Sequence, residues 1–172
     1  ALLATAGFVL LLGVEAGVVV GLLLSLGTMI WRESRPHIAV LGRIPHTEHF
    51  RNVDRYTVDT DRGVLLLRID AGLFFGNIEA VTRRIEDALA AHGEARELVL
   101  VLSAVNAIDS SALFGLLDLN RVLARRHIRL HLAEVKGPVL DRLRASTLLR
   151  ELSGRLFLST ANAWDALARH DT

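Results

Sequence analysis

The sequence predicts an α/β protein, in which a central β-sheet with about four helices is preceded by an α-helical transmembrane segment. Three observations lead to this prediction. Residues 1–30 are almost unbroken Leu, Val, Gly and Ala, with only Glu15 ionisable. From residue 56 onward, short apolar runs alternate with segments whose apolar residues recur at helical spacing. Residues 98–102 are apolar throughout, which is typical of a strand buried on both faces of a sheet.

Residues 1–31 are long enough to cross a membrane. A bilayer core of about 30 Å is crossed by about 20 apolar helical residues, and more than that number are available here. One long tilted helix and two short helices with a break near Glu15 both satisfy this length. A carboxylate is costly in hydrocarbon unless it faces protein or water, so Glu15 favours the break.

Small residues recur at every fourth position of this segment. Such a stripe lets another helix approach closely, so we expect it to form a helix-packing surface in the membrane. The stripe consists of Gly13, Gly17, Gly21 and Ser25.

Basic residues follow the apolar run and set its orientation. Arg32 and Arg35 lie on the carboxyl-terminal flank, and cytoplasmic flanks carry the excess of basic residues. We therefore expect residues 32–172 to lie in the cytoplasm. The chain opens on Ala1 inside an apolar segment, which is typical of a C-terminal fragment of a longer membrane protein.

Residues 32–53 read as a linker because Pro36, Gly42 and Pro45 interrupt them. The domain then covers residues 54–172. It is expected to begin with a hairpin of two strands, 56–59 and 64–69, around the turn at 61–63.

The remaining elements alternate between helix and strand. Asn77 is expected to cap a helix that Gly93 ends, and Asp109 or Ser110 to cap the helix after the buried strand. Thr160 is expected to cap the last helix. The full expected order is a helix over 78–92, a strand over 98–102, a helix from 110, a strand over 128–133, a helix opened by 136–138, a strand over 156–158 and a final helix.

Several kinds of chemistry have no motif in this chain. There is no glycine-rich phosphate loop, no His-Glu-x-x-His pair and no Gly-x-Ser-x-Gly elbow, so we expect no enzyme and no cofactor. The chain has no cysteine, which excludes disulfides and thiolate metal sites, and we expect no metal. The formal net charge of +1 gives no sign of a nucleic-acid partner.

The polar cluster of interest is Asp109, Ser110 and Ser111, which follow the buried strand. Open α/β sheets place their binding crevices at the carboxyl ends of such strands. The amino terminus of a helix offers free N–H groups and a positive dipole end, so a phosphate on Ser111, or a bound anion or nucleotide, would be stabilised there. The simpler interpretation, that Asp109 caps the helix, is favoured for that residue.

These residues carry a family resemblance. The segment Ile108-Asp109-Ser110-Ser111 resembles the Asp-Ser-Ser-Gly motif of STAS domains, the fold of bacterial anti-sigma-factor antagonists. In that family a partner kinase phosphorylates the second serine, which corresponds to Ser111. Ala112 stands where the motif has glycine, and this departure weakens the transfer of phosphorylation to this chain.

The whole chain also resembles the carboxyl-terminal end of SulP-family (sulfate permease) anion transporters. The resemblance rests on residues 15–25, on the junction 34–53, and on Leu73-Phe74-Phe75-Gly76-Asn77, which is similar to the family's Leu-Tyr-Phe-Ala-Asn. It implies a secondary transporter of anions such as sulfate or bicarbonate in the cell (inner) membrane.

In such a transporter the STAS domain would serve cytoplasmic regulation, dimerisation and stability. Its partners would be the remainder of the transporter, a second protomer, and a cytoplasmic regulatory protein or nucleotide. The substrate site of the family lies earlier in the chain, so no substrate-binding residue is expected here. The rival hypothesis is a membrane-anchored phospho-switch of the anti-sigma-antagonist kind, acting through Ser111.

Overall fold

The computed structural model describes residues 6–7, 14–34 and 36–168. The chain divides into two units, residues 1–35 and residues 36–172. In the first unit, helix α2 (Val14–Glu33) runs for 20 residues with Glu15 in its first turn. Its stretch Val14–Trp31 is long and apolar enough to cross a membrane, and only 6% of that stretch is buried within the structure. The helix begins where the sequence predicts a break and continues unbroken to its end.

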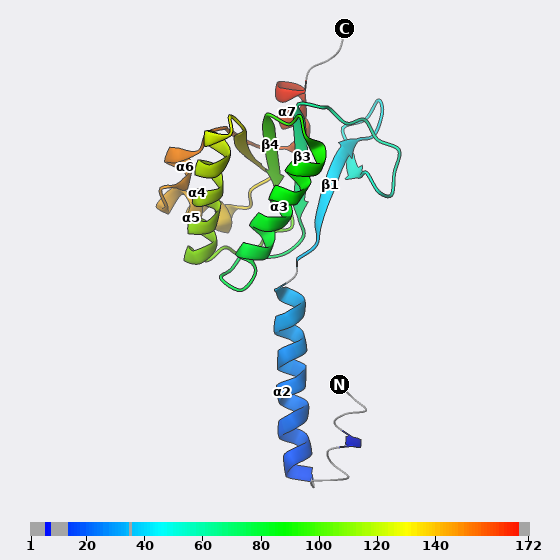
Figure 1. Cartoon of the computed structure of the whole chain (residues 1–172), viewed down its shortest axis with the longest axis vertical. Coiled ribbons are helices and arrows are strands. Elements are labelled where there is room, and N and C mark those ends of the chain that lie inside the picture. The colour runs from blue at the N-terminus through cyan, green and yellow to red at the C-terminus, as the bar shows by residue number, and fades with distance from the viewer. Residues whose placement is uncertain (1–5, 8–13, 35, 169–172) are drawn as a thin grey trace. The chain divides into compact units, whose positions relative to one another are not determined.

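The second unit is built on a six-stranded sheet with the strand order β2-β1-β3-β4-β5-β6 (Figure 1). Strand β1 pairs antiparallel with both of its neighbours, whereas the strands from β3 to β6 are parallel. The strands are β1 (Ile38–Arg43), β2 (Phe50–Asn52), β3 (Val64–Ile69), β4 (Glu97–Val101), β5 (Arg129–Ala133) and β6 (Leu156–Phe157).

Helices connect the parallel strands, as the sequence predicts, and the α/β fold with a preceding apolar helix is confirmed. The short helix α6 was not expected from the sequence. The helices of this unit are α3 (Ile78–His92), α4 (Ser110–Arg125), α5 (Gly137–Ala145), α6 (Leu148–Glu151) and α7 (Thr160–Leu167).

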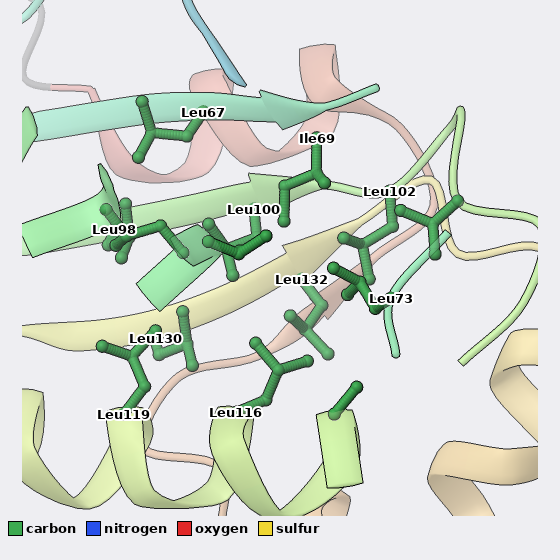
Figure 2. Packing of buried hydrophobic residues seen from close by; sticks show 14 of the residues in the cluster. Leu67, Ile69, Leu73, Leu98, Leu100, Leu102, Leu116, Leu119, Leu130 and Leu132 are labelled. Atoms are coloured by element: carbon green, nitrogen blue, oxygen red, sulfur yellow. The ribbon is translucent and has the colours of Figure 1, made fainter. Parts of the chain in front are cut away.

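One face of the sheet packs against α3, α4, α5 and α6. Alternate strand residues point to this face, so Leu98, Leu100 and Leu102 join the same apolar cluster as the inner side chains of the helices. Leu116 and Leu119 of α4 point toward the strands from below (Figure 2). Each fully buried leucine stabilises the fold by about 2 kcal/mol, so this layer supplies most of the hydrophobic stabilisation.

The opposite face of the sheet is covered by α7. Val99 and Val101 of β4 point to this side and share a cluster with Trp164. Trp164 also meets Phe50 edge to face, with ring centroids 5.9 Å apart. An ion pair of 2.8 Å between Arg43 and Asp165 adds a second link between this helix and the antiparallel edge.

The structure contradicts the prediction of a linker over residues 32–53, because β1 and β2 lie within that range. Ala39 and Leu41 are buried on the α7 side of the sheet, and Leu41 pairs with Leu66. Gly42 is typical of a loop in the sequence, but it lies inside strand β1. A Cβ at Gly42 would come within 2.5 Å of the Val58 side chain and 2.7 Å of the Asp59 carbonyl oxygen, so the close approach of residues 58–59 requires glycine.

The predicted hairpin is also wrong. Strand β3 takes β1 as its antiparallel partner, whereas residues 56–59 contribute only the isolated bridge between Arg43 and Asp59. The sequence favours the nearer apolar segment, but the strand that pairs with β3 contributes Ile38 and Val40 to one apolar cluster of the sheet and Ala39 and Leu41 to the other.

The structure also tests the predicted residues at the helix ends. Gly93 ends α3 in a left-handed conformation, with φ of 73°, as expected. Asn77 stands at the start of α3, but its side chain makes no capping hydrogen bond to the helix. Ser159, not Thr160, caps α7 by accepting from the backbone N–H of Asn162.

Leu100 gives a direct test of the central strand. Leu100→Asp places an unpaired charge at a side chain with no exposed surface, and its cost of several kcal/mol rivals the whole stability of a small domain. We expect the cooperative unfolding transition to disappear from circular dichroism in urea. Leu158→Asp is the matched control, because Leu158 is 92% exposed and should tolerate the same change. A cooperative transition in Leu100→Asp would contradict the placement of β4.

Candidate functional site

The candidate site lies at the amino terminus of α4, at the edge of the sheet where the parallel strands end. Asp109 is the residue before the helix and has extended backbone angles. Its Oδ1 accepts a hydrogen bond of 2.8 Å from the backbone N–H of Ala112. Asp109 therefore caps α4, and the expected capping role is confirmed.

The same carboxylate also holds a second segment. Asp109 Oδ2 accepts a hydrogen bond of 2.9 Å from the backbone N–H of Phe75, in the loop before α3. The two loops are further joined by a parallel bridge between Leu73 and Ile108. One side chain thus ties the loop 72–77 to the start of α4, a link that sequence spacing gave no means of finding.

Asn77 stabilises this loop from within. It is 1% exposed, accepts a hydrogen bond of 3.0 Å from the Phe74 N–H, and donates one of 2.8 Å to the Gly72 carbonyl oxygen. The side-chain amide makes hydrogen bonds that backbone groups make in an ordinary turn, so Asn77 fixes the conformation of the loop.

Ser110 and Ser111 are both exposed at the first turn of α4. Ala112, at the position of the glycine in the Asp-Ser-Ser-Gly motif, has no exposed surface. Its methyl group is accommodated in the core, and its N–H is the one that Asp109 caps. A hydroxyl on Ser111 is accessible to a modifying partner, and a phosphate there would meet the positive end of the helix dipole.

A groove of about 360 Å³ lies beside Ser110, between α4 and the α5–α6 segment. Leu113 and Leu117 form part of the apolar lining of the groove, and Arg142 is a charged residue in the lining. The sequence gave no sign of this groove, because its lining residues come from separate helices.

Two phenylalanines near the site are exposed. Phe75 is 76% exposed and Phe114 is 67% exposed, although both are large apolar side chains. Exposed aromatic side chains of this kind are common in surfaces that contact another molecule.

An ion-pair cluster stabilises the same edge of the sheet, where the chain enters β1. The carboxylate of Asp70 accepts hydrogen bonds from Arg68 Nε at 2.6 Å and Nη2 at 3.1 Å, and lies 3.0 Å from His37 Nδ1. Burial alone would raise the pKa of Asp70, but the hydrogen bonds from Arg68 and His37 outweigh it, and the pKa lies below its usual value.

Other predicted site residues lie in the first unit. Gly17, Gly21 and Ser25 fall within α2, and their four-residue spacing places them on one side of the helix. Gly13 lies outside the described residues. Within the ranges that the structure describes, no three His, Asp or Glu side chains come together as metal ligands.

Comparison with known proteins identifies the second unit. The STAS domain family model matches residues 55–163. Sulfate transporter 1.3 of Arabidopsis thaliana is 33% identical over 170 residues, which cover 92% of this chain and 26% of the transporter. High affinity sulfate transporter 2 of Stylosanthes hamata is 31% identical over 162 residues, covering 87% of this chain and 24% of that protein. The chain thus spans about a quarter of the length of these relatives.

Solved structures share the fold. The murine Solute Carrier 26 family member A9 anion transporter, in the inward-facing state, superposes with a TM-score of 0.82 at 17% identity, over 95% of this chain and 27% of that chain. A putative anti-sigma factor antagonist of Thermotoga maritima superposes with a TM-score of 0.56 at 21% identity, over 64% of this chain and 91% of that one.

Asp109 can be tested through stability. Asp109→Ala removes both the cap of α4 and the bond to the Phe75 N–H, so we expect the free energy of unfolding to fall by about 1–2 kcal/mol. Urea titration of the chain in detergent, followed by circular dichroism, measures this loss. Ser111→Ala is the matched control, because it removes an exposed hydroxyl and should change stability by less than about 0.5 kcal/mol. Equal stabilities of the two variants would contradict the double role of Asp109.

Proposed function

The chain belongs to the STAS domain family, as a STAS region of the SulP/SLC26 transporters, and from this premise we propose that it is the carboxyl-terminal part of a secondary anion transporter. In this proposal α2 is a membrane helix of the transporter. The STAS domain is its cytoplasmic part and serves regulation, dimerisation and stability. The chain has no enzymatic role.

The observation that carries the proposal is the direct connection between an apolar helix and a STAS domain. Helix α2 ends at Glu33, and the first strand of the sheet begins at Ile38. A helix of 20 residues with an apolar surface has no stable place in water, whereas it matches the thickness of a bilayer. The small residues Gly17, Gly21 and Ser25 would let a neighbouring membrane helix pack against it closely.

The flanking charges support a cytoplasmic domain. Arg32 and Arg35 follow the apolar stretch, and basic residues at the ends of membrane helices gather on the cytoplasmic side. This assignment places the domain on the side where a cytoplasmic regulatory protein or a nucleotide would reach Asp109, Ser110 and Ser111. The cell (inner) membrane is the corresponding location.

The transported species is proposed from the relatives. The curated relatives are named sulfate transporters, so an oxyanion such as sulfate is the proposed substrate, with bicarbonate as the second member of the class. The substrate site would lie in the remainder of the transporter. The STAS domain would act on transport by stabilising the assembly of two protomers.

Fractionation of two forms of the chain tests the membrane attachment. Residues 36–172 form a compact unit and should remain in the soluble fraction with a cooperative unfolding transition. The chain of residues 1–172 should pellet with membranes, resist extraction by alkaline carbonate, and enter solution only with detergent. Recovery of the full chain as a soluble monomer without detergent would contradict the proposal.

An exposed Ser111 on a fold shared with anti-sigma factor antagonists favours a second candidate function, the membrane-anchored phospho-switch. If this candidate holds, Ser111→Asp should change the amount of co-purified cytoplasmic partner at least about tenfold, equivalent to about 1.4 kcal/mol. Quantitative mass spectrometry of affinity-purified full chain measures this, with Ser111→Ala as the uncharged comparison. Equal partner profiles for the two variants would contradict the phospho-switch candidate.

A further inference from the structure

His131 lies in the middle of β5 and is completely buried, yet it is polar and titratable. It points to the α7 side of the sheet, where its ring packs 5.6 Å from the ring of Phe157 in β6. A buried polar side chain is costly unless its hydrogen bonds are made, so its partners define its role.

Both ring nitrogens of His131 have partners, and together they fix its protonation state. Nδ1 accepts a hydrogen bond of 2.9 Å from the backbone N–H of Arg155, so Nδ1 carries no proton. Nε2 lies 2.7 Å from Oε2 of Glu97 and donates to it. The hydrogen-bond network therefore assigns the neutral imidazole with its proton on Nε2.

The charged groups around His131 come from three elements. Glu97 of β4 is the acidic partner that the described residues supply, and Arg129 of β5 forms an ion pair with the same carboxylate. Arg155, in the segment before β6, lies with its guanidinium 5.2 Å from the centre of the Phe157 ring. The Glu97 carboxylate would favour a proton added to His131, whereas the two arginines and the backbone donor at Nδ1 would oppose it.

Strand β6 is short, and His131 supplies one of the hydrogen bonds that attach the segment in front of it to the sheet. Strand β6 has two residues and forms only two residue pairs with β5. Beside the ladder of this pair, backbone bonds run from Leu132 N–H to the Arg155 carbonyl oxygen at 3.1 Å and from Glu134 N–H to the Phe157 carbonyl oxygen at 3.3 Å. Arg155 N–H to His131 Nδ1 is shorter than either.

Segment 153–168 also carries α7, which covers the second face of the sheet. Contacts with Glu134, Arg43 and Phe50, together with the apolar cluster around Trp164, hold α7 on this face. Loss of the β6 attachment would loosen α7 and expose the apolar surface beneath Trp164.

We propose that His131 is an acid-sensitive latch: protonation of its Nδ1 breaks the hydrogen bond from the Arg155 N–H and releases the β6–α7 segment from the sheet. The protonated ring has donors on both nitrogens and cannot accept from Arg155. The released segment uncovers a face of the sheet on the α7 side, so the domain has two states that differ in exposed surface.

The direction of the pH dependence follows from burial. Burial lowers the pKa of His131, and Arg129 and Arg155 lower it further, whereas the hydrogen bond and charge of Glu97 raise it; the net shift is downward from 6.5. Above pH 6.5 the ring is neutral in both states, and the closed state keeps its full stability. As the pH falls below 6.5, the open state takes up the proton more readily, so opening is increasingly favoured until the pKa of the closed state is reached.

Trp164 provides the readout, because it lies in α7 and is 6% exposed. The chain has two tryptophans, so Trp31→Phe leaves Trp164 as the only emitter. With this full-length protein in detergent, lowering the pH from 8 to 5 should shift the emission to longer wavelength below about pH 6.5. Hydrogen-exchange protection of residues 153–168, corrected for intrinsic rates, should fall by up to roughly tenfold per pH unit over the same interval.

Two variants separate the latch from a general acid effect. His131→Asn keeps an oxygen that can accept from Arg155 but cannot take up a proton in this range, so its emission should stay constant down to pH 5. His92→Gln is the matched control: His92 is also hydrogen-bonded, through Nε2 to the Asp61 carbonyl oxygen at 3.0 Å, but lies on α3. This control should keep the acid response.

A response in His131→Asn equal to that of the parent would overturn the proposal, as would constant emission and protection in the parent. Imidazole ¹⁵N chemical shifts of the parent give an independent test if the variant fails to fold. They should show an Nε2–H tautomer at pH 7.5 and a protonation midpoint that coincides with the loss of protection in 153–168. Protonation of His131 without that loss would refute the latch.

Discussion

The structure depends on a strand, β4, that is buried on both faces. The side chains of Leu98, Val99, Leu100 and Val101 are almost fully removed from water, so the sheet is stable only if both of its sides are covered. Crossover helices cover one side as a consequence of linking parallel strands. The other side depends on α7, which is eight residues long and arrives last in the chain. Among the described elements, four helices thus cover one face and one short helix covers the other.

This asymmetry also places the two regions of interest. The loops that leave the carboxyl ends of β3 and β4 lie next to each other, and there Asp109 joins the loop 72–77 to the start of α4. On the opposite side of the sheet, the single covering helix leaves room for a polar network, in which Glu97 and His131 connect neighbouring strands. The site on the α4 side is thus held by hydrogen bonds from Asp109 to two segments, whereas the α7 side contains the proposed latch.

The parts of the fold that could be predicted from sequence are those that local patterns determine. The apolar run at 98–102, the helical spacing after residue 77 and the left-handed Gly93 each follow from nearby residues, and each is present in the structure. The antiparallel edge could not be predicted in this way. Strand β1 contains Gly42 because Val58 and Asp59 come too close for a larger residue. From the sequence alone, such a glycine cannot be distinguished from a glycine in a loop. The partner of β3 likewise contributes side chains to the apolar clusters on both faces of the sheet, which come together only in the folded chain.

At the candidate site, the sequence predicted the cap formed by Asp109 but not its bond to Phe75, because that bond joins residues 34 positions apart. The sequence did not indicate that His131 is buried and hydrogen-bonded. A buried histidine in an alternating strand has the same sequence pattern as a half-exposed one, and only its neighbours in the fold distinguish the two. The groove beside Ser110 could not be predicted either, because the residues that line it come from separate helices.

The central claim is that a membrane helix holds a STAS domain on the cytoplasmic side, and cysteine accessibility tests it most directly. The chain has no cysteine, so Leu158→Cys, at a fully accessible position, introduces a unique label site. In intact cells expressing the full chain, a membrane-impermeant maleimide should leave this cysteine unmodified, and permeabilisation of the membrane should make it reactive. Labelling in intact cells at the rate seen after permeabilisation would contradict the account.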